Sequence, residues 1–313
     1  MSPAALTDTL SLENEQLSVR LRPGQGAKLC SLLDRRTGRD WLIPSQLPGG
    51  VYLQPTCGDD FSRFDTSGFD DCFPTVSACK APGMDIQWPD HGELWSRPWE
   101  VTREGASLLA RIDGQAWPYT FSRRVSLEGD TLCLDYTLDN RADRPFPNLW
   151  SAHPLLKVSP GMKLWLPGSP GSAFLNAPSD PAFGSHGEAR PWPELLPGVD
   201  FSTVQPRSLG RAVKVFFPRV QEGTCGILEP QSGEALTFTW NQAELPHLGL
   251  WLCYGGWPDD GRPGHLTVAL EPCTGLPDRL DEAAEGGTCL MLPPGGRAAW
   301  SLRLRSHHLH SRS

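Results

Sequence analysis

The chain has 313 residues, of which 39% are hydrophobic and 20% are charged, so it can bury a sizeable core and is not expected to be disordered. Its net charge is −8 and no basic run occurs, which argues against nucleic acid as a partner. The 32 glycines and 31 prolines are spread along the chain, which favours many short strands over long helices.

The N-terminal segment, residues 1–16, has neither the basic region nor the apolar stretch of a secretory signal. No run of about 18 uncharged apolar residues occurs anywhere in the chain. We therefore expect a cytoplasmic protein without a membrane partner. The nine cysteines are widely spaced and form no CxxC pair, which favours reduced and mostly buried thiols.

Apolar and polar residues alternate with a period of two in several segments, most clearly in 131–140, where Leu132, Leu134, Tyr136 and Leu138 share one face. The segments that we predict as strands are 107–112, 119–127, 131–140, 212–217, 235–240, 248–254, 266–270 and 298–304. So many short strands predict an all-β protein, and a two-sheet sandwich fits them best.

Other segments lack this alternation. Residues 167–206 are rich in proline, glycine and serine and are predicted to form long surface loops. Residues 277–285 are the best helical candidate, because the segment is followed by Gly286 and Gly287. We expect a single domain over residues 1–305 and a flexible tail over 306–313.

The signatures of several common chemistries are missing. The chain has no GxxxxGK[ST] phosphate loop, no GxGxxG after a strand and no GxSxG elbow. The segment His91-Gly92-Glu93 has the H-x-E spacing of zinc deaminases but lacks their P-C-x-x-C partner, so we expect no metal.

Twelve tryptophans are more than the usual share, and several of them flank segments that contain histidine and acidic residues. A pyranose has an apolar C–H face that packs on an indole ring and a rim of hydroxyl groups that needs polar partners. This composition indicates a sugar-binding site, although packing in the core explains any single tryptophan equally well.

Five segments, in this order, are similar to those of the aldose 1-epimerase family: GFDDCFPTV (68–76), DHGELW (90–95), SAHPLL (151–156), LGLW (248–251) and LEPCTGLPD (270–278). They span most of the chain, and together they are fairly specific. Ala152 before the second histidine and Glu93 after the His-Gly pair depart from the usual pattern, so the chain resembles a divergent member of the family.

This resemblance implies a galactose mutarotase-like β-supersandwich whose concave sheet binds the sugar. It also implies an aldose 1-epimerase activity without a cofactor, in which His153 is the general acid and Glu271 is the general base. By the same resemblance His91 and Asp71 contact the substrate, and Trp251 forms a wall of the pocket.

The chemistry can also be derived from the sugar. Exchange of the α and β anomers needs a base to remove the C1 hydroxyl proton and an acid to protonate the ring oxygen. The ring then opens, the C1–C2 bond rotates and the ring closes on its other face. A carboxylate and an imidazole are suitable partners, because the pKa of each is within reach of neutrality.

Two alternatives remain open. An epimerase of a sugar phosphate would need a basic cluster, and Arg63 and Arg97 lie near the site segments as single arginines. A carbohydrate-binding protein without catalysis would keep the aromatic concave face and lose turnover. The sequence does not distinguish a monomer from a homodimer, and it does not name the aldose.

Overall fold

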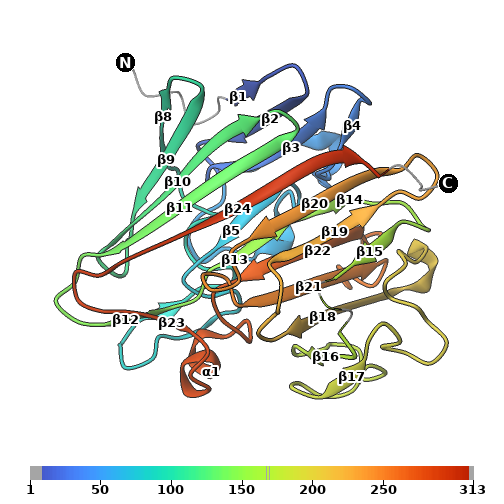
Figure 1. Ribbon diagram of the computed structural model, residues 1–313. Coiled ribbons are helices and arrows are strands. Elements are labelled where there is room, and N and C mark those ends of the chain that lie inside the picture. The colour runs from blue at the N-terminus through green and yellow to red at the C-terminus, as the bar shows by residue number, and fades with distance from the viewer. Residues whose placement is uncertain (1–8, 167, 169, 310–313) are drawn as a thin grey trace.

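The structure is a computed structural model that describes residues 9–166, 168 and 170–309. Two large antiparallel sheets dominate it, as Figure 1 shows. The all-β expectation is therefore confirmed. No helix within the described residues combines the length and the apolar character needed to cross a membrane.

The first large sheet has twelve strands, ten of which follow one another in the order β1-β2-β3-β5-β13-β22-β21-β18-β16-β17, while β4 pairs with β3 and β14 pairs with β22. The bounds are β1 Leu10–Glu13, β2 Leu17–Arg22, β3 Lys28–Asp34, β4 Arg39–Asp40, β5 Phe69–Cys72, β13 Ser151–Pro154, β14 Leu156–Lys157, β16 Ser172–Leu175, β17 Ala189–Pro191, β18 Arg211–Phe217, β21 His247–Tyr254 and β22 Leu266–Cys273.

The second large sheet has eight strands in the order β15-β19-β20-β24-β11-β10-β9-β8. Their bounds are β8 Glu100–Glu104, β9 Ser107–Asp113, β10 Tyr119–Glu128, β11 Thr131–Asn140, β15 Lys163–Trp165, β19 Thr224–Leu228, β20 Glu234–Trp240 and β24 Arg297–His308.

The remaining elements are small. Two further pairs of strands, β6 with β7 and β12 with β23, form two-stranded sheets. The bounds are β6 Cys79–Lys80, β7 Gln87–Trp88, β12 Phe146–Asn148, β23 Leu290–Leu292, α1 Leu280–Glu285 and the 3₁₀ turns η1 Pro48–Gly50, η2 Phe61–Arg63 and η3 Arg207–Leu209.

The core lies between the two large sheets, which Figure 1 shows as stacked layers. Its centre is aromatic: Tyr136 of β11 and Trp300 of β24 stack with their ring centroids 5.5 Å apart, and Trp150, next to β13, lies 5.2 Å from Trp300. Each strand of the first sheet therefore has a core face and an opposite face. The opposite face carries the site described below.

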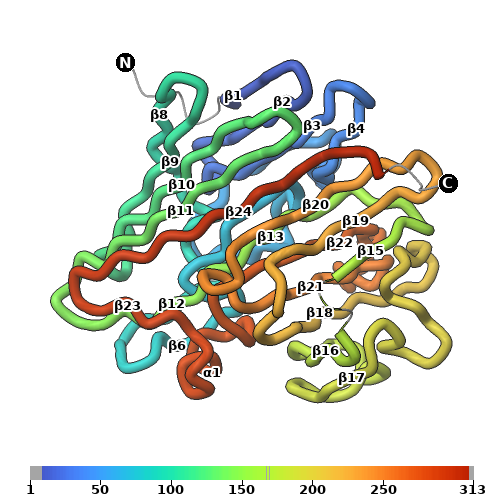
Figure 2. The backbone as a smooth tube through the Cα atoms, viewed as in Figure 1, coloured from blue at the N-terminus to red at the C-terminus, as the bar shows by residue number. Residues whose placement is uncertain are grey.

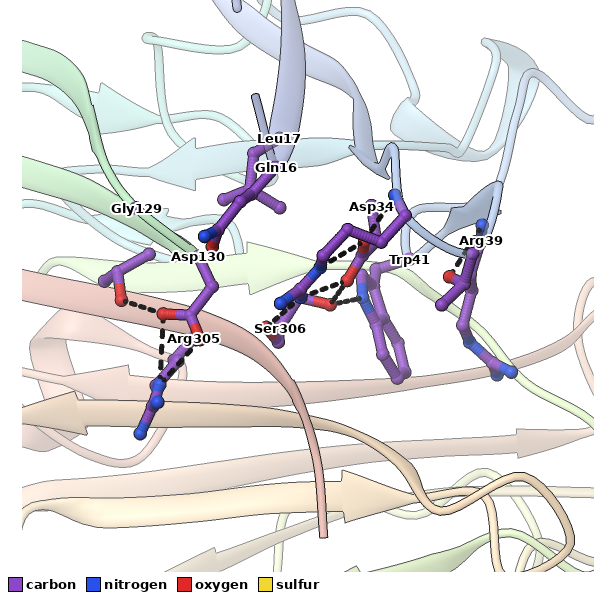
Figure 3. A network of polar contacts seen from close by, with 12 residues as sticks. Gln16, Leu17, Asp34, Arg39, Trp41, Gly129, Asp130, Arg305 and Ser306 are labelled. Atoms are coloured by element: carbon purple, nitrogen blue, oxygen red, sulfur yellow. Dashed lines mark hydrogen bonds and ion pairs between the residues drawn. The ribbon is translucent and has the colours of Figure 1, made fainter. Parts of the chain in front are cut away.

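The last strand, β24, lies in the middle of its sheet between β11 and β20, as the tube in Figure 2 shows. Ser306 on this strand is buried and joins the two sheets, because its hydroxyl donates to Asp34 and accepts from the indole N–H of Trp41, at 2.7 and 2.8 Å (Figure 3). A flexible tail that starts at residue 306 is therefore a wrong expectation, since the strand continues to His308. Residues 310–313 lie outside the described residues.

All eight predicted strands are present, with bounds that differ by up to four residues from those predicted. The predicted helix is α1, which begins three residues later than expected, at Leu280. The loop predicted over residues 167–206 is wrong in part, because it contains β16 and β17 at the edge of the first sheet. These edge strands are short and lack a clear alternation, which is why the pattern did not predict them.

Candidate functional site

The register of the first sheet determines which side chains share its outer face. Ser151 of β13 pairs with Cys72 of β5 on one side and with Cys273 of β22 on the other. His153 pairs with Asp70. Because side chains alternate along a strand, every second residue of these strands faces away from the core.

A cavity of about 320 Å³ opens on this outer face. This volume lies within the range of small-molecule sites, about 300–1,000 Å³. The side chains that line the cavity are Phe61, Val76, Ser77, Asp90, His91, His153, Leu155, Asn176, Ala177, Pro178, Ser179, Ala212, Val213, Lys214, Trp251, Trp257, His265, Thr267, Glu271 and Asp278. Four of the five expected site residues, namely His153, Glu271, His91 and Trp251, are therefore brought together from distant parts of the chain.

His153 and Glu271 lie on neighbouring strands. One register relates β13 and β14 to β22, since it pairs Ser151 with Cys273 and Leu156 with Val268. Between these two pairs, the same register puts His153 opposite Glu271. Side chains opposite each other on adjacent antiparallel strands have Cβ atoms about 5 Å apart. The backbone positions of His153 and Glu271 are thus adjacent on the part of the sheet that forms the cavity floor.

His153 is 7% exposed, and its Nδ1 has no hydrogen-bond partner among the residues that the structure describes. Burial lowers the pKa of His153 well below its usual value, and the positive charges of His91, Lys214 and Lys28 act in the same direction. Both effects make a proton on this imidazole easy to release.

His91 lies beside His153 in the loop after β7, with the ring centroids 5.2 Å apart. Its ring stacks on Phe61 at 4.0 Å, and its Nδ1 is 2.7 Å from the Asp90 carboxylate. Burial disfavours the imidazolium, but Asp90, together with Asp278 and Asp70, outweighs this effect and raises the pKa of His91. The backbone of His91 has a positive φ of 58°, and Gly92 follows with a φ of 69°. This turn directs the His91 side chain to the cavity.

Glu271 is fully buried, and its Oε2 accepts hydrogen bonds from the Lys214 ammonium group and from Ser151 Oγ, the latter at 3.4 Å. Its Oε1 has no partner within the described residues. Burial raises the pKa of Glu271, although Lys214 acts in the opposite direction. The Lys214 ammonium is also 3.5 Å from Asp278 Oδ1.

Trp251 on β21 and Trp257 in the following loop form one wall, with ring centroids 6.1 Å apart and nearly perpendicular planes. Trp251 is half-buried, so part of its ring is available to a ligand. The tryptophans near His91 behave differently: Trp88, Trp95 and Trp99 are buried and do not line the cavity. These three tryptophans therefore pack in the protein interior, as the alternative to a sugar-binding role had it.

Asp71 lies on the wrong face of its strand to contact a ligand in the cavity. It is buried on the core side, where it forms an ion pair of 2.6 Å with Arg123 of β10 and accepts a hydrogen bond of 3.0 Å from the Trp150 indole N–H. The expected substrate contact is therefore wrong. Asp70 and Asp71 are consecutive in the strand, so they point to opposite faces, and the strand pattern does not reveal which face is the core.

Asp70 faces the other way and belongs to a buried cluster with Lys28 and Asp65. The Lys28 ammonium is 2.5 Å from Asp65 and 3.0 Å from Asp70. Burial raises the pKa of Asp70 to about 6, although Lys28 acts against this shift. This cluster does not line the cavity itself.

Metal binding needs a close group of donor atoms. In the part of the chain that the structure describes, Cys72, His91 and His153 are such a group, since their potential ligand atoms lie within 4.8 Å of one another. Burial raises the pKa of the Cys72 thiol well above its usual value, so without a metal it is a neutral thiol. Thiolate and imidazole ligands suit zinc. A metal bound there would use both His91 and His153, so neither imidazole would then be free to act on a ligand in the cavity.

The sequence did not point to Lys214, Asp278, Asn176 or Phe61 as site residues. Asp278 is the last residue of the LEPCTGLPD segment, so the resemblance could have indicated it. Lys214 lies in the strand that the alternation predicted over residues 212–217, and nothing in the local sequence indicates that this lysine faces a cavity. Its position in the site depends on the pairing of β18 with β21.

Comparison with known proteins identifies the family of this chain. Residues 8–300 match the family model described as aldose 1-epimerase. No curated protein matches the sequence.

Several solved structures have the same fold. A protein of Synechocystis sp. is 16% identical with a TM-score of 0.72, and the match covers 99% of this chain and 98% of that one. A galactose mutarotase-like protein from Lactobacillus casei is 16% identical with a TM-score of 0.69, covering 96% and 100%. A galactose mutarotase-like protein from Clostridium acetobutylicum is 13% identical with a TM-score of 0.70, covering 96% and 95%. At identities this low the likeness establishes the fold, and the expected galactose mutarotase-like fold is confirmed.

Proposed function

Because this chain belongs to the aldose 1-epimerase family, we propose that it interconverts the α and β anomers of an unphosphorylated aldose, with Glu271 as general base and His153 as general acid. The observation that carries this proposal is the arrangement of these two residues on adjacent strands of one cavity floor. The two oxygens that exchange protons are both bonded to C1 of the sugar. An acid and a base that start from adjacent positions therefore suit the reaction.

The pKa shifts also support this pair. A carboxyl group ordinarily has a pKa of about 4.3 and an imidazole about 6.5. Burial raises the pKa of Glu271, which makes its carboxylate a better base, and lowers the pKa of His153, which makes its imidazolium a better acid. Each shift favours the proton transfer that ring opening requires of that group.

One proton shared by the pair is enough for a full cycle. Ring opening takes the C1 hydroxyl proton to Glu271 while protonated His153 gives its proton to the ring oxygen. Closure reverses both transfers after the C1–C2 bond has rotated, which regenerates both groups. Positioned acid and base groups typically contribute about 10²–10⁴-fold to such a rate.

Neighbouring groups would bind the sugar. Glu271 Oε1 and Asp278 Oδ1 are buried oxygens without a hydrogen-bond partner in the described residues, so each can accept a sugar hydroxyl. His91 is oriented by Asp90 and would contact a further hydroxyl. The indole of Trp251 would pack on the apolar face of the ring.

The cavity offers little to a phosphate group. Apart from the histidines, Lys214 is the one cationic side chain that the described residues contribute to the lining, and it is already paired with two carboxylates. Arg63 has an 80% exposed side chain and lies outside the lining, as does Arg97. This charge distribution favours a neutral sugar over a sugar phosphate.

The test follows freshly dissolved α-glucose and α-galactose by polarimetry or proton NMR. The wild-type protein should accelerate equilibration, and His153→Ala and Glu271→Gln should each remove about 100-fold or more of the accelerated rate. His247→Ala and Glu93→Gln are matched controls, because both residues are buried outside the cavity.

The same experiment separates catalysis from binding. If the sugar resonances broaden in the presence of protein while equilibration stays at the uncatalysed rate, the chain is a carbohydrate-binding protein and the proposal is refuted. Equal acceleration by wild type and Glu271→Gln would refute the role of the base.

A further inference from the structure

We propose that Lys214 is a positioning residue of this site, which keeps the buried Glu271 carboxylate ionised and fixed in one orientation. This inference rests on the proposed function, in which Glu271 is the base. Lys214 donates to Glu271 Oε2, while Oε1 has no hydrogen-bond partner in the described part of the chain. One oxygen of the carboxylate is thus anchored and the other is left for the substrate.

The contact between Lys214 and Glu271 crosses an intervening strand. Glu271 lies on β22 and Lys214 on β18, and β21 runs between these two strands. Glu271 pairs with Gly249 of β21, and Lys214 pairs with Trp251 two residues further along. A Cβ atom at Gly249 would be 3.2 Å from Lys214 Cε and 3.3 Å from Glu271 Oε2. A side chain at Gly249 would therefore crowd the space in which the ammonium group meets the carboxylate.

A second carboxylate holds the ammonium from the other side. Asp278 Oδ1 is 3.5 Å from the Lys214 nitrogen, and Asp278 Oδ2 accepts a hydrogen bond of 2.8 Å from the Asn176 side chain. The backbone N–H of Asp278 donates to Asn176 Oδ1 at 3.3 Å in return. Lys214 is thus fixed between two carboxylates, and one of these is itself held by an amide.

The charges around Glu271 make this lysine necessary. Glu271 is fully buried, and an isolated buried carboxylate takes up a proton rather than stay charged. Its neighbours with titratable groups are Lys214 from β18, Asp278 from the loop after β22, His91 from the loop after β7, His153 from β13, Cys72 from β5 and Cys273 from β22. Asp278 repels the negative charge, and burial raises the pKa of both thiols, so they are neutral. Lys214 is the permanent cation in direct contact.

The state of Lys214 itself agrees with this role. Burial acts to lower its pKa, but Asp278 and Glu271 outweigh burial and raise it. The side chain is therefore a stable ammonium. A neutral amine that could attack the aldehyde of an open-chain sugar is disfavoured.

The experiment measures the pH profile of sugar equilibration in wild type and in Lys214→Met. Loss of the ammonium raises the pKa of Glu271, so the acid limb of kcat/KM should move to higher pH by about 1–3 units. Lys214→Arg keeps the positive charge and should restore most of the wild-type profile. An unchanged acid limb in folded Lys214→Met would overturn the proposal.

Two further variants test whether the shift of the acid limb is specific to the contact between Lys214 and Glu271. Gly249→Ala keeps both charges but pushes a methyl group between them, so it should move the acid limb in the same direction by a smaller amount. Lys28→Met removes the other buried lysine, which contacts Asp65 and Asp70. If Lys28→Met moves the acid limb as far as Lys214→Met does, the effect is not specific and the proposal fails.

Failure of the proposed function can be told apart from failure of this inference. Infrared difference spectra report carboxylate protonation without turnover, and Glu271→Gln assigns the band of Glu271. Ionised Glu271 in wild type and protonated Glu271 in Lys214→Met at neutral pH would support the role of Lys214 even if no sugar is turned over. The same protonation state in both proteins would contradict it.

Discussion

Replacing Asp71 by asparagine should destabilise this protein without removing an atom from the sugar cavity. Asp71 and Arg123 both have side chains that are 0% exposed, and they form a direct ion pair between the two large sheets. The guanidinium of Arg123 also donates to the carbonyl of Ala27, and Asp71 accepts from Trp150. In Asp71→Asn the guanidinium keeps its charge but loses the only carboxylate with which it forms an ion pair in the described residues.

The expected magnitude follows from the burial of the charge. Breaking a buried ion pair by removing one partner typically costs about 3–5 kcal/mol, because the remaining charge is left uncompensated. Asparagine can still accept from Trp150, so no further cost is expected there. With a urea m value of about 3 kcal/mol/M, the unfolding midpoint should fall by about 1–1.7 M. Removing the second charge as well, in Asp71→Asn with Arg123→Met, should recover at least half of this loss.

The assay is urea unfolding followed by tryptophan fluorescence, combined with sugar equilibration measured where each variant is folded. We expect folded Asp71→Asn to retain equilibration activity within about threefold of wild type, a difference of about 0.7 kcal/mol. A stability equal to that of wild type together with a large loss of activity would refute this reasoning. It would return Asp71 to the substrate-binding role that the sequence suggested.

Three other predictions concern the tryptophan wall of the cavity, the turn at Gly92 and the dependence of stability on pH. Trp251→Ala should raise KM about tenfold, or ~1.4 kcal/mol, with little change in kcat, because it removes the apolar surface that would pack on the sugar; an unchanged KM in equilibration kinetics would contradict this. Gly92→Ala should lower the free energy of unfolding by more than about 2 kcal/mol, because its Cβ would be 1.9 Å from the Phe73 carbonyl oxygen. Gly83 has a similar positive φ but open space around it, so Gly83→Ala should lower the free energy of unfolding by only about 1–2 kcal/mol in the same urea unfolding experiment. Burial lowers the pKa of His247 to about 4, whereas an unfolded histidine titrates near 6.5, so the free energy of unfolding should fall as the pH drops from about 6.5 to 4. His247→Gln should flatten that slope in urea midpoints measured across this range, and an identical slope would exclude His247 as the cause.

The candidate site was partly predictable, because its most distinctive residues lie in short segments with a recognisable local sequence. His91, His153, Glu271 and Trp251 were each identified in this way, and all four line the cavity. Their convergence followed from the family resemblance, since no local pattern relates residues so far apart in the chain.

Asp71 shows where local reasoning ended. Alternation says that Asp70 and Asp71 face opposite ways, but only the second sheet decides which face becomes the core. Lys214 illustrates the same limit, since it contacts Glu271 across a third strand, next to a glycine.

Local structure and family membership could be predicted from the amino-acid sequence, through the period-two alternation that forms the strands and the short segments that resemble aldose 1-epimerases. The packing of the two sheets was needed to show which strands are neighbours, which face of each strand is buried, and therefore which charges lie in contact. The reason is physical, because strand formation depends on residues close together in the chain, whereas strand pairing and the burial of charge depend on residues that are distant in sequence.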